Sequence, residues 1–259
     1  MAQDCGNNCR HFFHLMPSSP AVKRLSKLKF IILAALLNRC GRLMMANLRM
    51  ASEDRHSEAI SIVDRSLHET AVKIIWLCHS KIKDRFQRYL ADGLKNDVEF
   101  KKHILSNIKR RKHKIEIEKR MLKSIRRSVV TSQLSIPTIE KTPKLPDLFS
   151  MIREIGYADI SYIVIQRMGS HHVHGTWTGL LANVIDGEDA LTLREGFNSP
   201  HSNQLMFSSL IVLDAVAAFI EFVAKGKDKR VLLRILRTYR DSLLAHNSLM
   251  AAPDMQPPE

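Results

Sequence analysis

The chain has 259 residues, of which 40 are Lys or Arg and 26 are Asp or Glu, so its formal net charge is +14. Hydrophobic residues make up 45% of the chain and charged residues 25%, as in ordinary folded proteins, which excludes disorder throughout. The positive charge predicts an anionic partner, either nucleic acid or an acidic membrane surface. Four cysteines, scattered apart from Cys5 and Cys9, do not make a disulfide scaffold, and we expect a reducing, cytoplasmic compartment.

Apolar residues recur at helical spacing along nearly the whole chain, and no convincing run of alternating strand residues is found, which predicts an all-α helical bundle. We expect an irregular lead over 1–20, a single helical domain over 21–248 and a disordered tail over 249–259. The predicted helices span 21–50, 52–80, 82–94, 98–130, 148–174 (with a break near Gly156), 203–225 and 228–248. A proline-rich linker is expected at 131–147 and a loop at 176–202.

Two apolar stretches resemble a signal peptide or a membrane-spanning helix in composition. Residues 30–37 are too short and lie too far into the chain for a signal peptide. Residues 206–224 are nearly long enough to cross a bilayer, but Asp214 and Glu221 interrupt them, and a charge near a membrane-helix centre costs roughly 2.5–3.5 kcal/mol. We therefore expect a buried core helix and no stable membrane insertion.

The positive charge is concentrated in one predicted helix. Between Lys101 and Arg127 there are twelve Lys or Arg and only two acids, Glu116 and Glu118. A phosphate backbone would relieve the repulsion, and few aromatic residues interrupt the run, so backbone contact without base reading is expected. A solvated face and a membrane surface remain alternatives. The candidate nucleic-acid-binding residues are Lys109, Arg110, Arg111, Lys112, Lys114, Lys119, Arg120, Lys123, Arg126 and Arg127.

A cluster of basic residues ends the predicted helix 148–174. On a continuous α-helix, with about 100° per residue, Arg167, His171 and His174 share one face and Ser170 lies at its margin. An Arg that binds phosphate beside an imidazole that transfers protons suits phosphodiester chemistry. Two alternatives stay open: a structural role, in which His174 caps the helix, or a metal site that includes His171 and His174.

Arg65 and Glu69 are spaced i,i+4 on another predicted helix. Because Ile62, Val72 and Trp76 flank them on the same stripe, we expect an at least partly buried pair that contacts a polar cluster of another helix. Arg167 and His174 are candidates for that cluster, and a purely structural ion pair is the alternative.

These residues carry a family resemblance. The segments Arg65-Ser-Leu-His-Glu69 and Arg85-Phe-Gln-Arg-Tyr89, and the stretch from Glu154-Ile-Gly156 to Arg167-x2-Ser170-x2-Val173-His174-Gly175, resemble a bacterial all-helical family of unknown function over roughly 40–180. That family in turn looks like a divergent relative of the HEPN domains, whose signature is an Arg separated from a His by four to six residues. Six residues separate Arg167 from His174.

The resemblance implies a dimeric, helical, metal-independent ribonuclease of a toxin–antitoxin, CRISPR or anti-phage system, although some relatives are non-catalytic. Arg167 and His174 would form the catalytic pair at a dimer interface, and the products would be a 2′,3′-cyclic phosphate and a 5′-hydroxyl. Met168 departs from the signature, which often has a polar residue after the Arg.

A second match to the same signature is Arg240 with His246, which have five residues between them. On a continuous helix the two side chains differ by about 120° and do not face one point. We keep this pair as a second candidate site.

The terminal group Cys5, Cys9, His11 and His14 is too compressed for an ordinary zinc finger, so neither metal nor cofactor is expected. The sequence therefore predicts an RNA-binding, HEPN-like ribonuclease effector of bacterial defence, with an operon-encoded antitoxin as a conceivable partner. A non-catalytic interaction module and, more weakly, a membrane-associated toxin are the alternatives.

Overall fold

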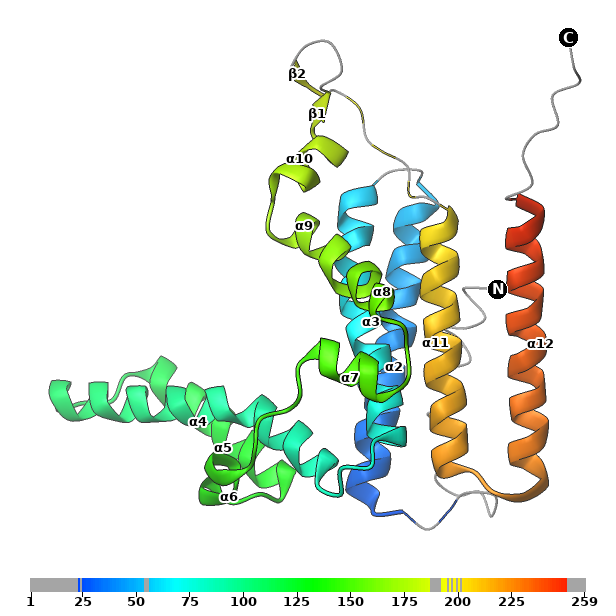
Figure 1. Cartoon of the computed structure of the whole chain (residues 1–259). Coiled ribbons are helices and arrows are strands. Elements are labelled where there is room, and N and C mark those ends of the chain that lie inside the picture. The colour runs from blue at the N-terminus through cyan, green and yellow to red at the C-terminus, as the bar shows by residue number, and fades with distance from the viewer. Residues whose placement is uncertain are drawn as a thin grey trace, which may run out of the picture. The chain divides into compact units, whose positions relative to one another are not determined.

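In the computed structural model, the described residues are 23, 25–53, 56–186, 192–194, 196, 198, 200 and 202–250, with the backbone alone at 186, 202 and 246–250. The described chain is all-α, as predicted (Figure 1). It divides into two compact units: unit 1 comprises residues 1–79 and 148–259, and unit 2 comprises residues 80–147. The lead expected at 1–20 and the Cys5–His14 cluster lie outside the described residues, as does the expected tail beyond residue 250.

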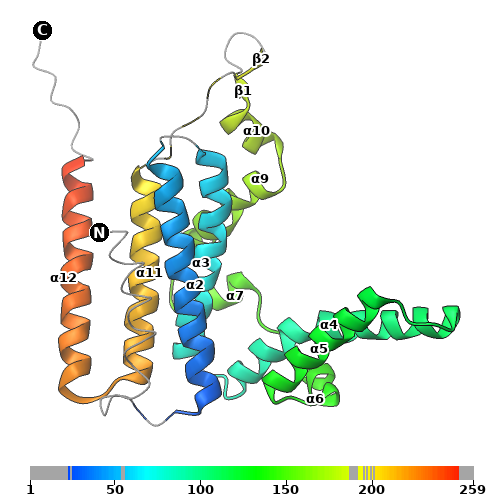
Figure 2. The same cartoon turned by 180° about the vertical axis from the view of Figure 1, so that it is seen from behind.

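Four long helices form the core of unit 1: α2 (Lys27–Ala51), α3 (Ser57–His79), α11 (Ser202–Val223) and α12 (Gly226–Met250). Figure 2 shows α2, α11 and α12 side by side from behind. The interior is filled by large apolar side chains of facing helix stripes, because each helix repeats an apolar residue every three or four positions. The fully buried ones include Leu33, Leu37 and Met44 of α2, Leu67, Ile74 and Trp76 of α3, and Val212, Val216 and Phe219 of α11.

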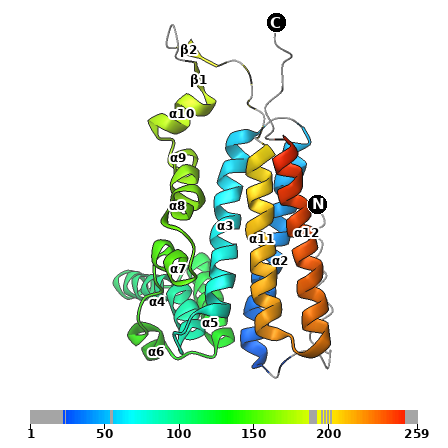
Figure 3. The same cartoon turned by 45° about the vertical axis from the view of Figure 1, so that its right-hand side comes forward.

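A chain of short helices runs along α3 in unit 1 (Figure 3). It consists of α7 (Leu148–Glu154), α8 (Asp159–Tyr162), the π-helix η1 (Ile163–Met168), α9 (Gly169–Val173) and α10 (Trp177–Asn183). The predicted break near Gly156 is confirmed, since this glycine has a φ of +83°. The continuous α-helix expected from there to residue 174 is wrong, because the backbone widens into a π-turn at 163–168.

The loop expected at 176–202 is also wrong in part. It contains α10 and a two-stranded antiparallel hairpin, β1 (Ile185–Asp186) and β2 (Thr192–Leu193). Each strand has only two residues, too few for the alternating pattern that marks a strand in a sequence.

Unit 2 consists of α4 (Arg85–Arg111), α5 (Glu116–Ser132) and α6 (Ile136–Lys141). Its small core joins Ala91, Leu94 and Val98 of α4 to Ile139 of α6. The expected linker at 131–147 thus carries a helix that closes this core.

The helix limits predicted inside unit 2 are wrong. One helix runs through residues 95–97, and the break comes instead at Lys112, whose φ of +65° ends α4. Glu118 then accepts a hydrogen bond from the Ile115 backbone N–H at 3.1 Å, which caps the start of α5. The charged run predicted as one helix therefore spans the second half of α4 and most of α5.

Candidate functional site

The pair Arg65 and Glu69 forms the expected ion pair on α3, with 3.2 Å between Arg65 Nε and Glu69 Oε1. Their side chains are 18% and 29% exposed, so the prediction of a partly buried pair is confirmed. Arg65 Nη1 is buried and has no hydrogen-bond partner among the described residues. The guanidinium thus keeps one donor for another group.

Gly169 of α9 lies directly on Arg65. A Cβ atom at Gly169 would be 2.9 Å from Arg65 Cβ, closer than real Cβ atoms approach one another. The missing side chain therefore allows η1 and α9 to pack on α3 at this point. The segment that carries Arg167 and His174 is held beside the Arg65–Glu69 pair by this contact.

Arg167 and His174 are both exposed, on either side of Gly169. The Arg167 guanidinium lies 5.8 Å from the ring centroid of Tyr162, and no described residue accepts a hydrogen bond from it. His174 follows the last residue of α9, where its backbone N–H bonds to Ser170 O at 3.0 Å. The 100° spacing that placed the two on one face does not apply, because a π-turn has more residues per turn.

The two neighbouring candidates make local hydrogen bonds. Ser170 Oγ donates to Gln166 O at 2.7 Å, and His171 Nδ1 lies 2.8 Å from Thr176 Oγ1. These contacts fix the end of α9. Among the described residues, Ser170 and His171 form no hydrogen bond with Arg65 or Glu69.

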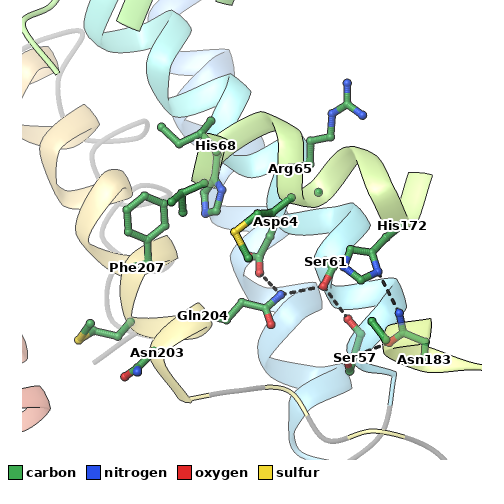
Figure 4. A pocket seen from close by; sticks show the side chains of 16 residues that line it. Ser57, Ser61, Asp64, Arg65, His68, His172, Asn183, Asn203, Gln204 and Phe207 are labelled. Carbon is green, nitrogen blue, oxygen red and sulfur yellow. Dashed lines mark hydrogen bonds between the residues drawn. The ribbon is translucent and has the colours of Figure 1, made fainter. Parts of the chain in front are cut away.

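A cavity of about 690 Å³ opens in unit 1 between α3, the η1–α9 segment and α11 (Figure 4). The α3 side carries a polar stripe, Ser57, Ser61, Asp64 and His68, at helical spacings of four, three and four residues. The other two sides are largely apolar: they include Val164, Ile165 and Met168 of η1, and Met206 and Phe207 of α11. Arg65 also lines the cavity, and it is the one lining residue that the sequence predicted as part of a functional site.

The polar residues of the cavity are joined by hydrogen bonds. Ser208 Oγ donates to Asp64 Oδ1 at 2.6 Å, and Gln204 Nε2 donates to Asp64 Oδ2 at 2.7 Å. His68 Nε2 lies 2.8 Å from Ser208 Oγ. Since the Ser208 proton goes to Asp64, His68 must donate from Nε2. Asn47 Nδ2 is a third donor to Asp64, at 2.6 Å to Oδ1.

Burial sets the protonation of this network. Loss of solvation raises the pKa of Asp64 to about 6, against the opposing effect of its hydrogen-bond donors. The same loss lowers the pKa of His68 to about 4, so this imidazole is neutral at pH 7. The site therefore holds one carboxylate that titrates close to neutral pH.

His172, which the sequence analysis did not include in the candidate site, lines the opposite end of the cavity. Its Nδ1 lies 3.0 Å from Asn183 Nδ2, whose amide oxygen accepts from Ser57 Oγ at 3.4 Å. Desolvation lowers the pKa of His172. A neutral ring that accepts at Nδ1 carries its proton on Nε2, so His172 offers a donor.

One signal in the sequence pointed toward the cavity. A stripe of serine, aspartate and histidine on an otherwise apolar helix indicates a buried polar network, because isolated buried polar groups are costly. The partners Gln204 and Ser208 had no such signal, since they come from α11, about 140 residues away.

The basic residues of unit 2 form an exposed surface over the end of α4 and α5. Arg111 is paired with Glu118 at 2.5 Å and Lys119 with Glu116 at 3.2 Å. Most of the others are exposed and have no acidic partner among the described residues: Lys109, Arg110, Lys112, Lys114, Arg120, Lys123, Arg126 and Arg127. The charge of this surface is thus largely unneutralised by the protein.

In the second candidate pair, the structure describes the side chain of Arg240 alone. Arg240 forms an ion pair with Asp214, which also accepts a hydrogen bond from Tyr157 Oη at 2.7 Å. The side chain of His246 lies outside the described residues. Arg240 therefore joins α12 to α11.

No group of three or more metal-ligating side chains occurs within the described part of the chain. One helix there, Asn203–Val223, is long and apolar enough to cross a membrane by length and composition, but most of it is buried in the bundle. Core helices of folded bundles share these properties, so this is weak evidence for a membrane span.

Neither the curated proteins nor the solved structures include a match to this chain. The model of one protein family, described as a family of unknown function (DUF5677), matches residues 30–191. This range includes Arg65, Glu69, Arg167 and His174, and it ends before α11. Because the match covers more than half of the chain, the protein belongs to the DUF5677 family of unknown function.

Proposed function

We propose that the protein binds RNA through the basic surface of unit 2 and cleaves it at Arg167 and His174 without a metal ion. It would then be a divergent HEPN-like ribonuclease. The proposed RNA binding is supported by the row of exposed Lys and Arg side chains, most of which have no acidic partner among the described residues. Neutralisation of phosphates by such residues releases counterions and drives association.

The proposed RNA cleavage is supported by the packing of Gly169 against Arg65. This contact holds the exposed Arg167 and His174 beside a partly buried ion pair. In the proposed reaction Arg167 binds the scissile phosphate, and His174 transfers a proton to or from the ribose hydroxyl or the leaving oxygen. Arg65 and Glu69 are positioning residues that support the α9 segment, and Ser170 and His171 hold its end in place.

A second copy of the chain would complete this site. Large apolar side chains are exposed on the same segment, as expected for a surface that a partner covers. They include Ile160, Ile163, Met168, Val173, Trp177 and Leu181. We propose a homodimer through this surface, with the two Arg167–His174 segments at the interface.

The cellular role follows from the proposed chemistry. A ribonuclease of this kind would act in the cytoplasm, as an effector or toxin of bacterial defence, restrained by a partner protein from the same operon. A non-catalytic nucleic-acid-binding module is the second candidate, favoured by the hydrogen bonds that already engage Ser170 and His171. The membrane-associated toxin is the weakest alternative, since most of α11 is buried.

The test is incubation of purified protein with total RNA in the presence of EDTA. We expect cleavage that leaves 2′,3′-cyclic phosphate ends, and His174→Ala should lower the rate by about 100-fold or more. His79→Ala is the matched control, because His79 is also exposed and lies at the far end of α3. Normal cleavage by a folded His174→Ala protein would exclude the proposed catalysis and leave the binding module.

A further inference from the structure

We propose that the cavity between α3, η1–α9 and α11 is a binding site for the uncharged base and sugar of a nucleoside. The source is either a free nucleoside or an unpaired base of a bound RNA. The proposal requires neither RNA cleavage nor the basic surface of unit 2, because every residue that lines the cavity belongs to unit 1.

Size and wall chemistry fit such a ligand. The volume of about 690 Å³ lies within the range of small-molecule sites. Phe207, Met168 and Val164 offer apolar contacts, while the α3 stripe offers hydrogen bonds. A flat heterocycle with polar edges needs both, since its faces are apolar and its edges carry donors and acceptors.

The network leaves both an acceptor and a donor unused. Gln204 Nε2 already bonds to Ser61 Oγ at 3.1 Å and to Asp64 Oδ2 at 2.7 Å, so both of its protons are engaged. Its Oε1 accepts no hydrogen bond from the described residues. At the other end, His172 Nε2 carries a proton and has no partner there. The two ends therefore suit a ligand with acceptors and donors along its length.

The charge of the Asp64 side chain favours the uncharged base and sugar of a nucleotide over its phosphate. The Asp64 carboxylate is 3% exposed and would repel a phosphate placed beside it. Arg65 also lines the cavity, but its charge is offset by its ion pair with Glu69. A cationic amine is also disfavoured, because Asn47, Ser208 and Gln204 already occupy three of the four acceptor positions of this carboxylate. A buried ammonium would keep too few hydrogen bonds to replace its water.

The first experiment measures thermal unfolding of the full chain with adenosine, guanosine, cytidine and uridine, and with benzylamine as the cationic probe. We expect at least one nucleoside at millimolar concentration to raise Tm by roughly 2–4 °C. Isothermal titration of that nucleoside then gives its Kd. No shift with any nucleoside, or a shift with benzylamine alone, would overturn the proposal.

Val164→Trp fills the cavity from a half-exposed wall position and leaves the polar network intact. It should weaken nucleoside binding by about tenfold or more, with a circular dichroism spectrum like that of the wild type. Val231→Trp on α12 is the matched control, because that valine is similarly exposed, at 44% against 36%, and does not line the cavity. Equal affinity in both variants would place the nucleoside elsewhere and contradict the assignment.

A second measurement distinguishes the two sources of the base. The protein is saturated with a 2′-O-methyl oligouridylate, which cannot form a cyclic phosphate, and is then titrated with the nucleoside. Loss of nucleoside binding, together with weaker oligonucleotide binding by Val164→Trp, identifies an RNA base as the occupant. Unchanged nucleoside binding identifies a free nucleoside, and both results support the shared chemistry.

Discussion

Ser208 of α11 donates a hydrogen bond to Asp64 of α3 over 2.6 Å, and the two residues lie 144 positions apart in the chain. This bond links α3 and α11, which both contribute to the core of the bundle and to the wall of the cavity. The same hydroxyl accepts from His68, so a carboxylate and an imidazole share one serine inside the protein.

The pKa shifts of Asp64 and His68 make the free energy of unfolding depend on pH. Burial raises the pKa of Asp64 to about 6 from an ordinary 3.8. The stability that this shift contributes to the folded state is therefore full below pH 3.8 and is lost as pH rises through 6. Burial lowers the pKa of His68 to about 4 from 6.5, so its contribution is full above pH 6.5 and is lost as pH falls through 4. The two effects oppose each other between pH 4 and 6.5 and largely cancel.

Substitution of either residue should reveal the pH dependence of unfolding free energy that the other residue causes. Between pH 7 and 4.5, Asp64→Asn should lose about 2 kcal/mol more unfolding free energy than the wild type, because only the His68 effect remains. His68→Gln should lose about 2 kcal/mol less than the wild type over the same interval. Urea denaturation at both pH values measures this. Asp228→Asn, on the exposed start of α12, is the control, and parallel behaviour of all the variants would contradict the assigned network.

Gly169→Ala should push α9 away from Arg65, since the new Cβ would lie 2.9 Å from the Arg65 Cβ. We expect a loss of about 1–3 kcal/mol of unfolding free energy and slower RNA cleavage. Gly93→Ala is the matched control: it lies inside α4 with no atom within 4 Å of its Cβ position, so it should gain about 0.5–1 kcal/mol. An unchanged unfolding free energy in Gly169→Ala would show that Gly169 and Arg65 are not tightly packed.

Replacement of Arg120, Lys123 and Arg127 by Gln should weaken RNA binding at low salt and reduce the slope of log K against log salt by about 2. All three are exposed on α5 and have no acidic partner among the described residues. Fluorescence anisotropy with a single-stranded RNA at several salt concentrations measures the slope. The triple change of Lys227, Lys229 and Arg230 on α12 removes equal charge from unit 1 and should leave the slope unchanged. An equal effect of both triples would indicate attraction by net charge alone.

Arg240→Ala should destabilise the protein by about 1 kcal/mol and leave RNA cleavage intact, because Arg240 pairs with the partly buried Asp214 and is itself half-exposed. Arg237→Ala, on the same exposed helix, should be close to neutral. Thermal unfolding and the cleavage assay together measure both effects. Loss of cleavage in a stable Arg240→Ala protein would instead favour the site at Arg240 and His246.

The sequence predicted features that depend on neighbours a few residues apart. The long helices of unit 1 follow from apolar spacing, and the Arg65–Glu69 pair follows from an i,i+4 contact on one helix. The break between α4 and α5 escaped prediction, because Lys112 adopts a left-handed conformation that usually calls for Gly or Asn. Such an end is set by packing and by the cap at Glu118.

Local spacing and composition predicted the helical class, the four long helices of unit 1 and the place where positive charge gathers. Only the tertiary structure brought Gln204 and Ser208 to Asp64, turned residues 163–168 into a π-helix and placed His172 in the cavity. These arrangements come from packing between helices distant in the chain, where burial and hydrogen bonding decide together which polar groups meet.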